Sequence, residues 1–187
     1  MFIQTEATPN PATLKFIPGT QVLPGGAREF RERAEAEQAS PLAARLFEID
    51  GVSGVFLGSD FISVTKSGGE WQHLKPALLG AIMEHYLSGA PAVTDAAPAG
   101  DGHSASHDGG EDSEIVQTIK ELLDTRVRPA VAQDGGDIVF HGYEDGVVFL
   151  HMRGACAGCP SSTATLRHGI ENLLRHFIPE VEEVRAV

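Results

Sequence analysis

The chain has 187 residues and a formal net charge of −12, from 14 lysines and arginines against 26 aspartates and glutamates. This acidity argues against a nucleic-acid-binding surface, and no apolar run approaches the roughly 18 residues that a membrane span needs. The length suits one domain or two small ones.

The opening residues Met1-Phe2-Ile3-Gln4-Thr5-Glu6 lack the basic-then-apolar order of a secretory signal and the Arg-rich character of a transit peptide. We therefore expect a cytosolic protein. Structural disulfides are rare in the cytosol, so the Cys-x-x-Cys pair of Cys156 and Cys159 indicates metal binding or redox chemistry.

Residues 1–89 predict a first α+β domain, which contains no cysteine. A hairpin is expected where the alternating segments 2–6 and 13–17 flank a proline-rich turn. A second hairpin is expected where segments 52–57 and 61–65 flank a Gly-Ser-Asp turn.

Two helices are expected to pack on these hairpins. Ser40-Pro41 supplies an N-cap and a first-turn proline for a short helix, and the amphipathic segment 75–87 predicts a longer helix that Gly89 ends. Segment 27–39 favours a helix but carries little apolar surface beyond Phe30. We interpret it as a solvated helix or excursion.

Residues 90–112 form a tract of mainly Ala, Gly, Pro, Asp, Ser and His. Such a segment buries too little apolar surface to offset its ordering entropy, so we predict a flexible linker. His103 and His107 are spaced as metal ligands on a helix would be, but the glycines around them disfavour a helix. A solvated tract is the favoured interpretation.

Residues 113–187 predict a second α+β domain with the order α-β-β-α-β. Its first helix spans 114–126, with Ser113 as cap and Pro129 as the residue that ends the helical run. The remaining expected elements are a turn at Asp134-Gly135-Gly136-Asp137, a strand at 138–143, a turn at Glu144-Asp145-Gly146, a strand at 147–152, a helix from Pro160 through Phe177 and a strand at 181–187.

Both cysteines lie in the loop Gly154-Ala155-Cys156-Ala157-Gly158-Cys159-Pro160-Ser161-Ser162, between a predicted strand and a predicted helix. Proline suits the first helical turn, which places Cys159 at or just before a helix N-terminus. The positive end of the helix dipole favours a thiolate, so we expect low pKa values for the two thiols. Such a pair can bind a soft metal or form a reversible disulfide.

A [4Fe–4S] cluster or a structural zinc takes four protein ligands, and the chain has two cysteines. Either other side chains complete the site or two chains share it. His141, His151 and His168 are the candidate helpers, although each is more readily explained as a structural histidine.

The second domain resembles the C-terminal domain of NifU-like proteins in its Asp134–Asp137 turn and its thiol loop. The first domain resembles the N-terminal domain of the Nfu type. The stretches that carry this second likeness are Phe2-Ile3-Gln4-Thr5, Thr8-Pro9-Asn10-Pro11, Leu14-Lys15-Phe16-Ile17-Pro18-Gly19, Ser40-Pro41-Leu42-Ala43, Val64-Thr65-Lys66 and Leu74-Lys75-Pro76.

The resemblance implies an iron–sulfur cluster scaffold or carrier, not an enzyme, that binds a [4Fe–4S] cluster between two subunits of a homodimer. Cys156 and Cys159 match the family's ligand pair. The resemblance further implies transfer to apo iron–sulfur proteins, supply by upstream cluster-assembly proteins and a partner-recognition role for the first domain. It implies a bacterial cytosol, or the mitochondrial matrix if the sequence is a processed form.

Two alternatives use the same thiol pair. A thiol–disulfide oxidoreductase would cycle a disulfide, but the strand order around the motif differs from a thioredoxin unit, whose motif follows a strand in a β-α-β start. A copper or zinc carrier would bind one ion without sulfide. We identify no catalytic residue, and we interpret Asp134 and Asp137 as turn and capping groups.

Overall fold

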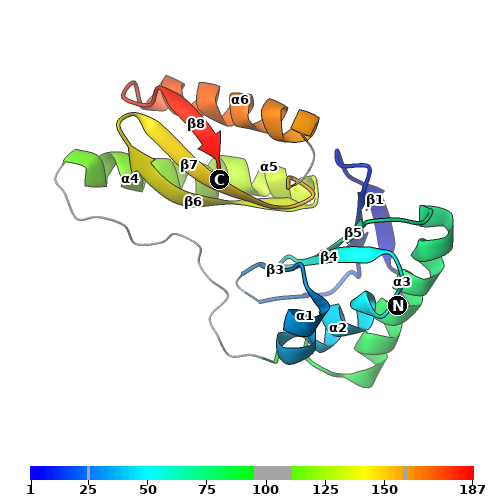
Figure 1. The fold of residues 1–187 in the computed structure, drawn as a ribbon. Helices are drawn as coiled ribbons and strands as arrows, with labels where there is room; N and C mark the ends of the chain where they lie inside the picture. The colour runs from blue at the N-terminus through cyan, green and yellow to red at the C-terminus, as the bar shows by residue number, and fades with distance from the viewer. Residues whose placement is uncertain (25, 95–110, 158–159) are drawn as a thin grey trace. The chain divides into compact units, whose positions relative to one another are not determined.

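The computed structural model describes residues 1–24, 26–94, 111–157 and 160–187. The chain divides into two compact units, Met1–Gly100 and Asp101–Val187, and each combines helices with a sheet (Figure 1). The expected α+β class with two domains is therefore confirmed. The division falls within the tract predicted as a linker, while the bounds 1–89, 90–112 and 113–187 stay predictions. His103 and His107 lie outside the described residues.

The first unit is built on a five-stranded sheet with the order β1-β2-β5-β4-β3. Strands β1 (Gln4–Ala7) and β2 (Thr13–Ile17) pair antiparallel, as do β4 (Val52–Leu57) and β5 (Ile62–Lys66). Both predicted hairpins are thus confirmed. Pairing of β2 with β5 joins the two hairpins into one sheet.

Helices α2 (Pro41–Phe47) and α3 (Trp71–Ser88) pack on this sheet (Figure 1). The Ser40 Oγ accepts a hydrogen bond of 3.0 Å from the Ala43 amide, as expected for an N-cap. Gly89 ends α3 in the left-handed region at φ 71°. Helix α3 begins at Trp71, before the predicted segment 75–87, so Pro76 lies within the helix.

The interpretation of residues 27–39 as a solvated helix or excursion is only partly correct. A helix forms and most of its residues are exposed, but the stretch also contributes a strand and buried side chains to the first unit. This stretch forms β3 (Arg28–Phe30), which pairs with β4, and α1 (Arg33–Ala39). The Phe30 and Ala36 side chains are fully buried in the core of the first unit. The buried residues of α1 are alanines, which give no clear apolar pattern in the sequence, so their burial was not predicted. Their small side chains let α1 lie close against the core.

The second unit combines a three-stranded sheet with helices on the face that carries its core (Figure 1). Strands β6 and β7 pair antiparallel, and β7 and β8 pair parallel. The predicted order α-β-β-α-β is confirmed, with a longer first helical run than expected. The elements are α4 (Glu111–Leu122), η1 (Leu123–Val127), α5 (Arg128–Gln133), β6 (Gly136–Glu144), β7 (Val147–Gly154), α6 (Pro160–Phe177) and β8 (Glu183–Ala186).

Two expectations for the first helical run are wrong. Helix α4 begins at Glu111, so Ser113 is not its cap. Pro129 does not end the run either, because α5 continues to Gln133. The intervening η1 is a π-helical turn in which the Arg128 amide bonds to the Leu123 carbonyl, and this wider turn accommodates the proline. None of the described helices is long and apolar enough to cross a membrane.

Candidate functional site

The thiol loop joins the end of β7 to the start of α6, as the sequence predicts. Strand β7 ends at Gly154, which has φ 63°, and α6 begins at Pro160. The Ala157 amide donates to the Gly154 carbonyl at 3.1 Å, so the chain turns sharply at Cys156. Cys159 lies outside the described residues, and the loop is described only as far as Ala157.

Cys156 is a free thiol that is buried in the core of the second unit. Cys156 is 7% exposed and belongs to the same apolar cluster as Ile138 and Met152. A Cβ atom on residue 136 would lie 2.5 Å from the Cys156 Sγ and 3.0 Å from its amide nitrogen. Glycine at position 136 is therefore what allows the thiol and its backbone to lie against β6.

The surroundings of Cys156 favour the neutral thiol. Burial, followed by the charges of Asp134 and Asp137, raises the pKa of Cys156 to about 12. The expectation of a low pKa is thus wrong for Cys156. The helix dipole acts only near its terminus, whereas desolvation and two carboxylates act directly on this thiol.

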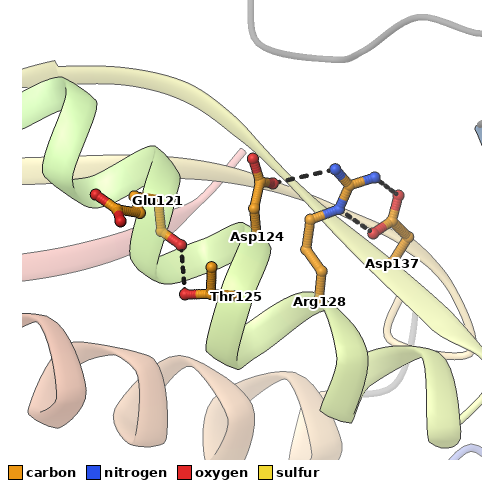
Figure 2. Close-up of polar contacts among 5 residues, drawn as sticks. All are labelled: Glu121, Asp124, Thr125, Arg128 and Asp137. Atoms are coloured by element: carbon orange, nitrogen blue, oxygen red, sulfur yellow. Dashed lines mark hydrogen bonds and ion pairs between the residues drawn. The ribbon is translucent and has the colours of Figure 1, made fainter.

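Asp137 is held by an arginine that the sequence did not point to. Arg128 donates from Nε to Asp137 Oδ1 at 3.0 Å and from Nη2 to Oδ2 at 3.1 Å, and its Nη1 donates to Asp124 at 3.1 Å (Figure 2). Asp137 was interpreted as a turn or capping group, but its buried carboxylate forms a bidentate ion pair that ties β6 to α5. The Asp124–Arg128 spacing of four residues was the available sequence signal.

The loop is also tied to its neighbours by hydrogen bonds. The Ala155 amide donates to the Gly135 carbonyl at 3.2 Å, which connects the loop to the turn before β6. The Thr163 hydroxyl, in the first turns of α6, donates to the Cys156 carbonyl at 2.9 Å. The sequence does not predict this contact of Thr163, because no sequence pattern distinguishes a helical threonine that bonds to a neighbouring loop from one that does not.

The candidate helper histidines do not gather around Cys156. His141 is exposed at the register shift of β6, and His168 is exposed on α6. The His151 Nδ1 lies 3.1 Å from the Val187 carbonyl oxygen. Across the described ranges, which omit Cys159, no group of three His, Cys, Asp or Glu side chains is placed to bind a metal ion.

Fold and site together define a protein of two α+β units, the second of which carries a thiol loop between a strand and a helix. The family model for the Nfu/NifU scaffold N-terminal domain matches residues 3–89, and the model for the NifU-like domain matches residues 119–185. The chain belongs to the Nfu/NifU family.

The chain is similar to several known proteins. The human protein named NFU1 iron-sulfur cluster scaffold homolog, mitochondrial, is 51% identical over 189 residues, which cover 100% of this chain and 72% of that protein. The protein of the same name from Drosophila sechellia is 50% identical, over 100% of this chain and 65% of its own length. A solved NifU-like protein from Saccharomyces cerevisiae has a TM-score of 0.46 at 23% identity, over 51% of this chain and 86% of that one.

Proposed function

We propose that this protein is an iron–sulfur cluster scaffold that binds a [4Fe–4S] cluster between two copies of the chain and delivers it to apo iron–sulfur proteins. The observation that carries the proposal is membership of the Nfu/NifU family together with a Cys-x-x-Cys pair within residues 119–185, which the NifU-like model matches. Cys156 and Cys159 are the proposed ligands, and no catalytic residue is proposed.

Ligand counting supports a shared cluster. A [4Fe–4S] cluster takes four thiolates, and the chain has two cysteines. The described part of one chain offers no larger ligand group that could replace the missing thiolates. Two copies supply four thiolates without recruiting His141, His151 or His168, so a homodimer formed around the cluster is the simplest arrangement.

Ligand exchange is the proposed transfer step. A thiol of the recipient loses its proton and bonds to iron, the bond from iron to Cys156 breaks, and the freed Cys156 takes up a proton. No electron changes hands, and the cluster keeps its charge. The core position beside Gly136 can then accept the neutral thiol again, which favours release of the cluster.

The remaining parts of the proposal concern partners and location. The first unit has no cysteine, and we assign it to recognition of recipients or of the upstream proteins that supply the cluster. We propose a bacterial cytosolic location, with the mitochondrial matrix as the alternative because similar proteins are named mitochondrial.

Anaerobic reconstitution with iron and sulfide tests the proposal. We expect about two iron and two sulfide per chain, a mass that doubles on loading, and Mössbauer spectra of a [4Fe–4S] cluster. Cys156→Ser and Cys159→Ser should each abolish stable cluster binding and leave the far-ultraviolet circular dichroism unchanged. Stoichiometric iron in both variants would overturn the ligand assignment.

The same experiment separates the alternatives. His151→Ala and His168→Ala are controls that should keep full iron content, and loss in either would indicate histidine ligation. A thiol–disulfide oxidoreductase would take up no cluster and would reduce insulin disulfides, but a Cys156 pKa near 12 leaves little thiolate for that exchange. A copper or zinc carrier would bind one ion without added sulfide.

A further inference from the structure

A side-chain hydrogen bond from α6 reaches the backbone of Cys156 in the thiol loop. The Thr163 Oγ1 donates to the Cys156 carbonyl at 2.9 Å. Pro160, at the start of α6, has no amide hydrogen and cannot supply this donor. The hydroxyl of a helical threonine is thus bonded directly to the backbone of the thiol-bearing residue.

The backbone of Cys156, like its thiol, is packed against β6. The amide nitrogen of Cys156, as well as its Sγ, lies against Gly136, and the neighbouring Ala155 is 2% exposed. The Ala155 amide is bonded to the Gly135 carbonyl at 3.2 Å. We therefore expect the thiol to reach a ligand at the surface when residues 155–157 move away from β6.

We propose that Thr163 is a positioning residue that holds the described loop residues 154–157 in place, with Cys156 in the core, and that cluster binding requires the Thr163–Cys156 bond to open. The meaning of this step for cluster loading rests on the proposed scaffold function. The bond itself can be tested in the full chain without iron.

The first test uses a Cys159→Ser background, in which Cys156 is the only thiol. Thr163→Val keeps the side-chain shape and removes the hydroxyl. We expect Cys156 alkylation at one fixed pH and hydrogen exchange of the Ala155 amide both to accelerate about five-fold, the typical effect of losing one neutral hydrogen bond. Exchange at Ala155 does not depend on thiol ionisation, so agreement of the two rates identifies loop opening.

Three further variants make the result specific. Thr163→Ser retains the hydroxyl and should restore the slow rates, whereas Thr163→Ala should reproduce the acceleration if the valine variant folds poorly. Thr118→Val is the matched control, because the Thr118 hydroxyl donates to the Glu114 carbonyl at 2.9 Å on the exposed side of α4. That control should leave both rates unchanged.

Unchanged rates in Thr163→Val and Thr163→Ala would overturn the proposal, as would an acceleration that Thr163→Ser fails to reverse. A second arm measures the initial rate of cluster assembly in the chain with both cysteines, where Thr163→Val should also assemble about five-fold faster. Faster alkylation with no cluster in any variant would sink the scaffold function alone. Normal assembly with unchanged opening rates would sink the role of Thr163 alone.

Discussion

The Cys156 sulfur packs directly against Gly136: a Cβ atom at position 136 would lie 2.5 Å from the cysteine sulfur. The glycine begins β6 and the cysteine follows β7, and the two strands pair at this end through Gly136 and Gly154. The turn before β6 and the thiol loop after β7 are therefore one packed structure, although they are separated along the chain.

Gly136→Ala should disrupt this contact. The added Cβ would also lie 2.9 Å from the Arg153 carbonyl and 3.0 Å from the Cys156 amide nitrogen, and backbone atoms cannot rotate away. We expect a loss of about 2 kcal/mol in the unfolding free energy, measured by urea denaturation, and faster alkylation of Cys156. Gly142→Ala in the same strand is the control, because a Cβ there meets nothing within 4 Å. Equal stability of the two variants would contradict the contact.

The pH dependence of Cys156 alkylation should be shifted to the alkaline side. Burial and the nearby aspartates raise the pKa of Cys156 to about 12, whereas a free cysteine titrates near 8.5. In Cys159→Ser at pH 8, we expect iodoacetamide to react at least about 100-fold more slowly than in the urea-unfolded chain.

The same pKa shift predicts how this thiol affects stability. A raised pKa in the folded state stabilises the fold fully below the unfolded pKa, and this contribution is lost as the pH rises toward the folded value near 12. As the pH is raised from about 9 to about 12, the unfolding free energy of Cys156→Ala should therefore fall less than that of the parent chain. Parallel pH–stability curves for the two chains would contradict burial of the thiol.

Arg128→Met should destabilise the second unit. The substitution leaves the Asp137 carboxylate, whose side chain is 9% exposed, without its bidentate partner. We expect a loss of about 3 kcal/mol in the unfolding free energy, because an unpaired buried charge is costly. Arg128→Lys should recover only part of this loss, since an ammonium group cannot form the two parallel bonds.

A matched control exists on β8 for the arginine substitution. Arg185 bonds both oxygens of Glu183, but this pair lies at the surface. Arg185→Met should leave the denaturation midpoint unchanged. A similar shift of the denaturation midpoint in Arg128→Met and Arg185→Met would mean that the loss of stability does not come from the burial of Asp137.

Phe30→Ala tests whether residues 27–39 belong to the core. Phe30 is fully buried in the cluster that also contains Ala36 and Leu42. We expect the first unit to lose about 4 kcal/mol of unfolding free energy, measured by chemical denaturation. Phe2→Ala is the control, since Phe2 is 85% exposed. A solvated excursion would instead give no loss in either variant.

Local signals accounted for much of the fold. Ser40 caps α2, Gly89 ends α3 and Pro160 begins α6, because each of these positions depends on the conformational preference of one residue and its near neighbours. The burial of Ala36 could not be predicted in this way. It depends on the tertiary packing of the first unit, where Ala36 shares a core cluster with residues of α2 and of the distant strands β4 and β5.

For the site, the sequence pointed to the loop but not to the environment of Cys156. Its place between strand and helix followed from local patterns and from the family resemblance. Its burial depends on Gly136, and the fixed position of Asp137 depends on Arg128, so both result from pairing between distant segments. The expectation of a low pKa failed because a helix terminus was visible in the sequence and these contacts were not.

The parallel pairing of β7 with β8 has a consequence for how the protein is made. The thiol loop and α6 lie in the crossover between these two strands, so the loop leaves the ribosome before the strand that completes its sheet. The core cluster that contains Cys156 also contains Val184 of β8. This core is therefore complete only after the last strand of the chain has been made, and the thiol-bearing loop is synthesised before it.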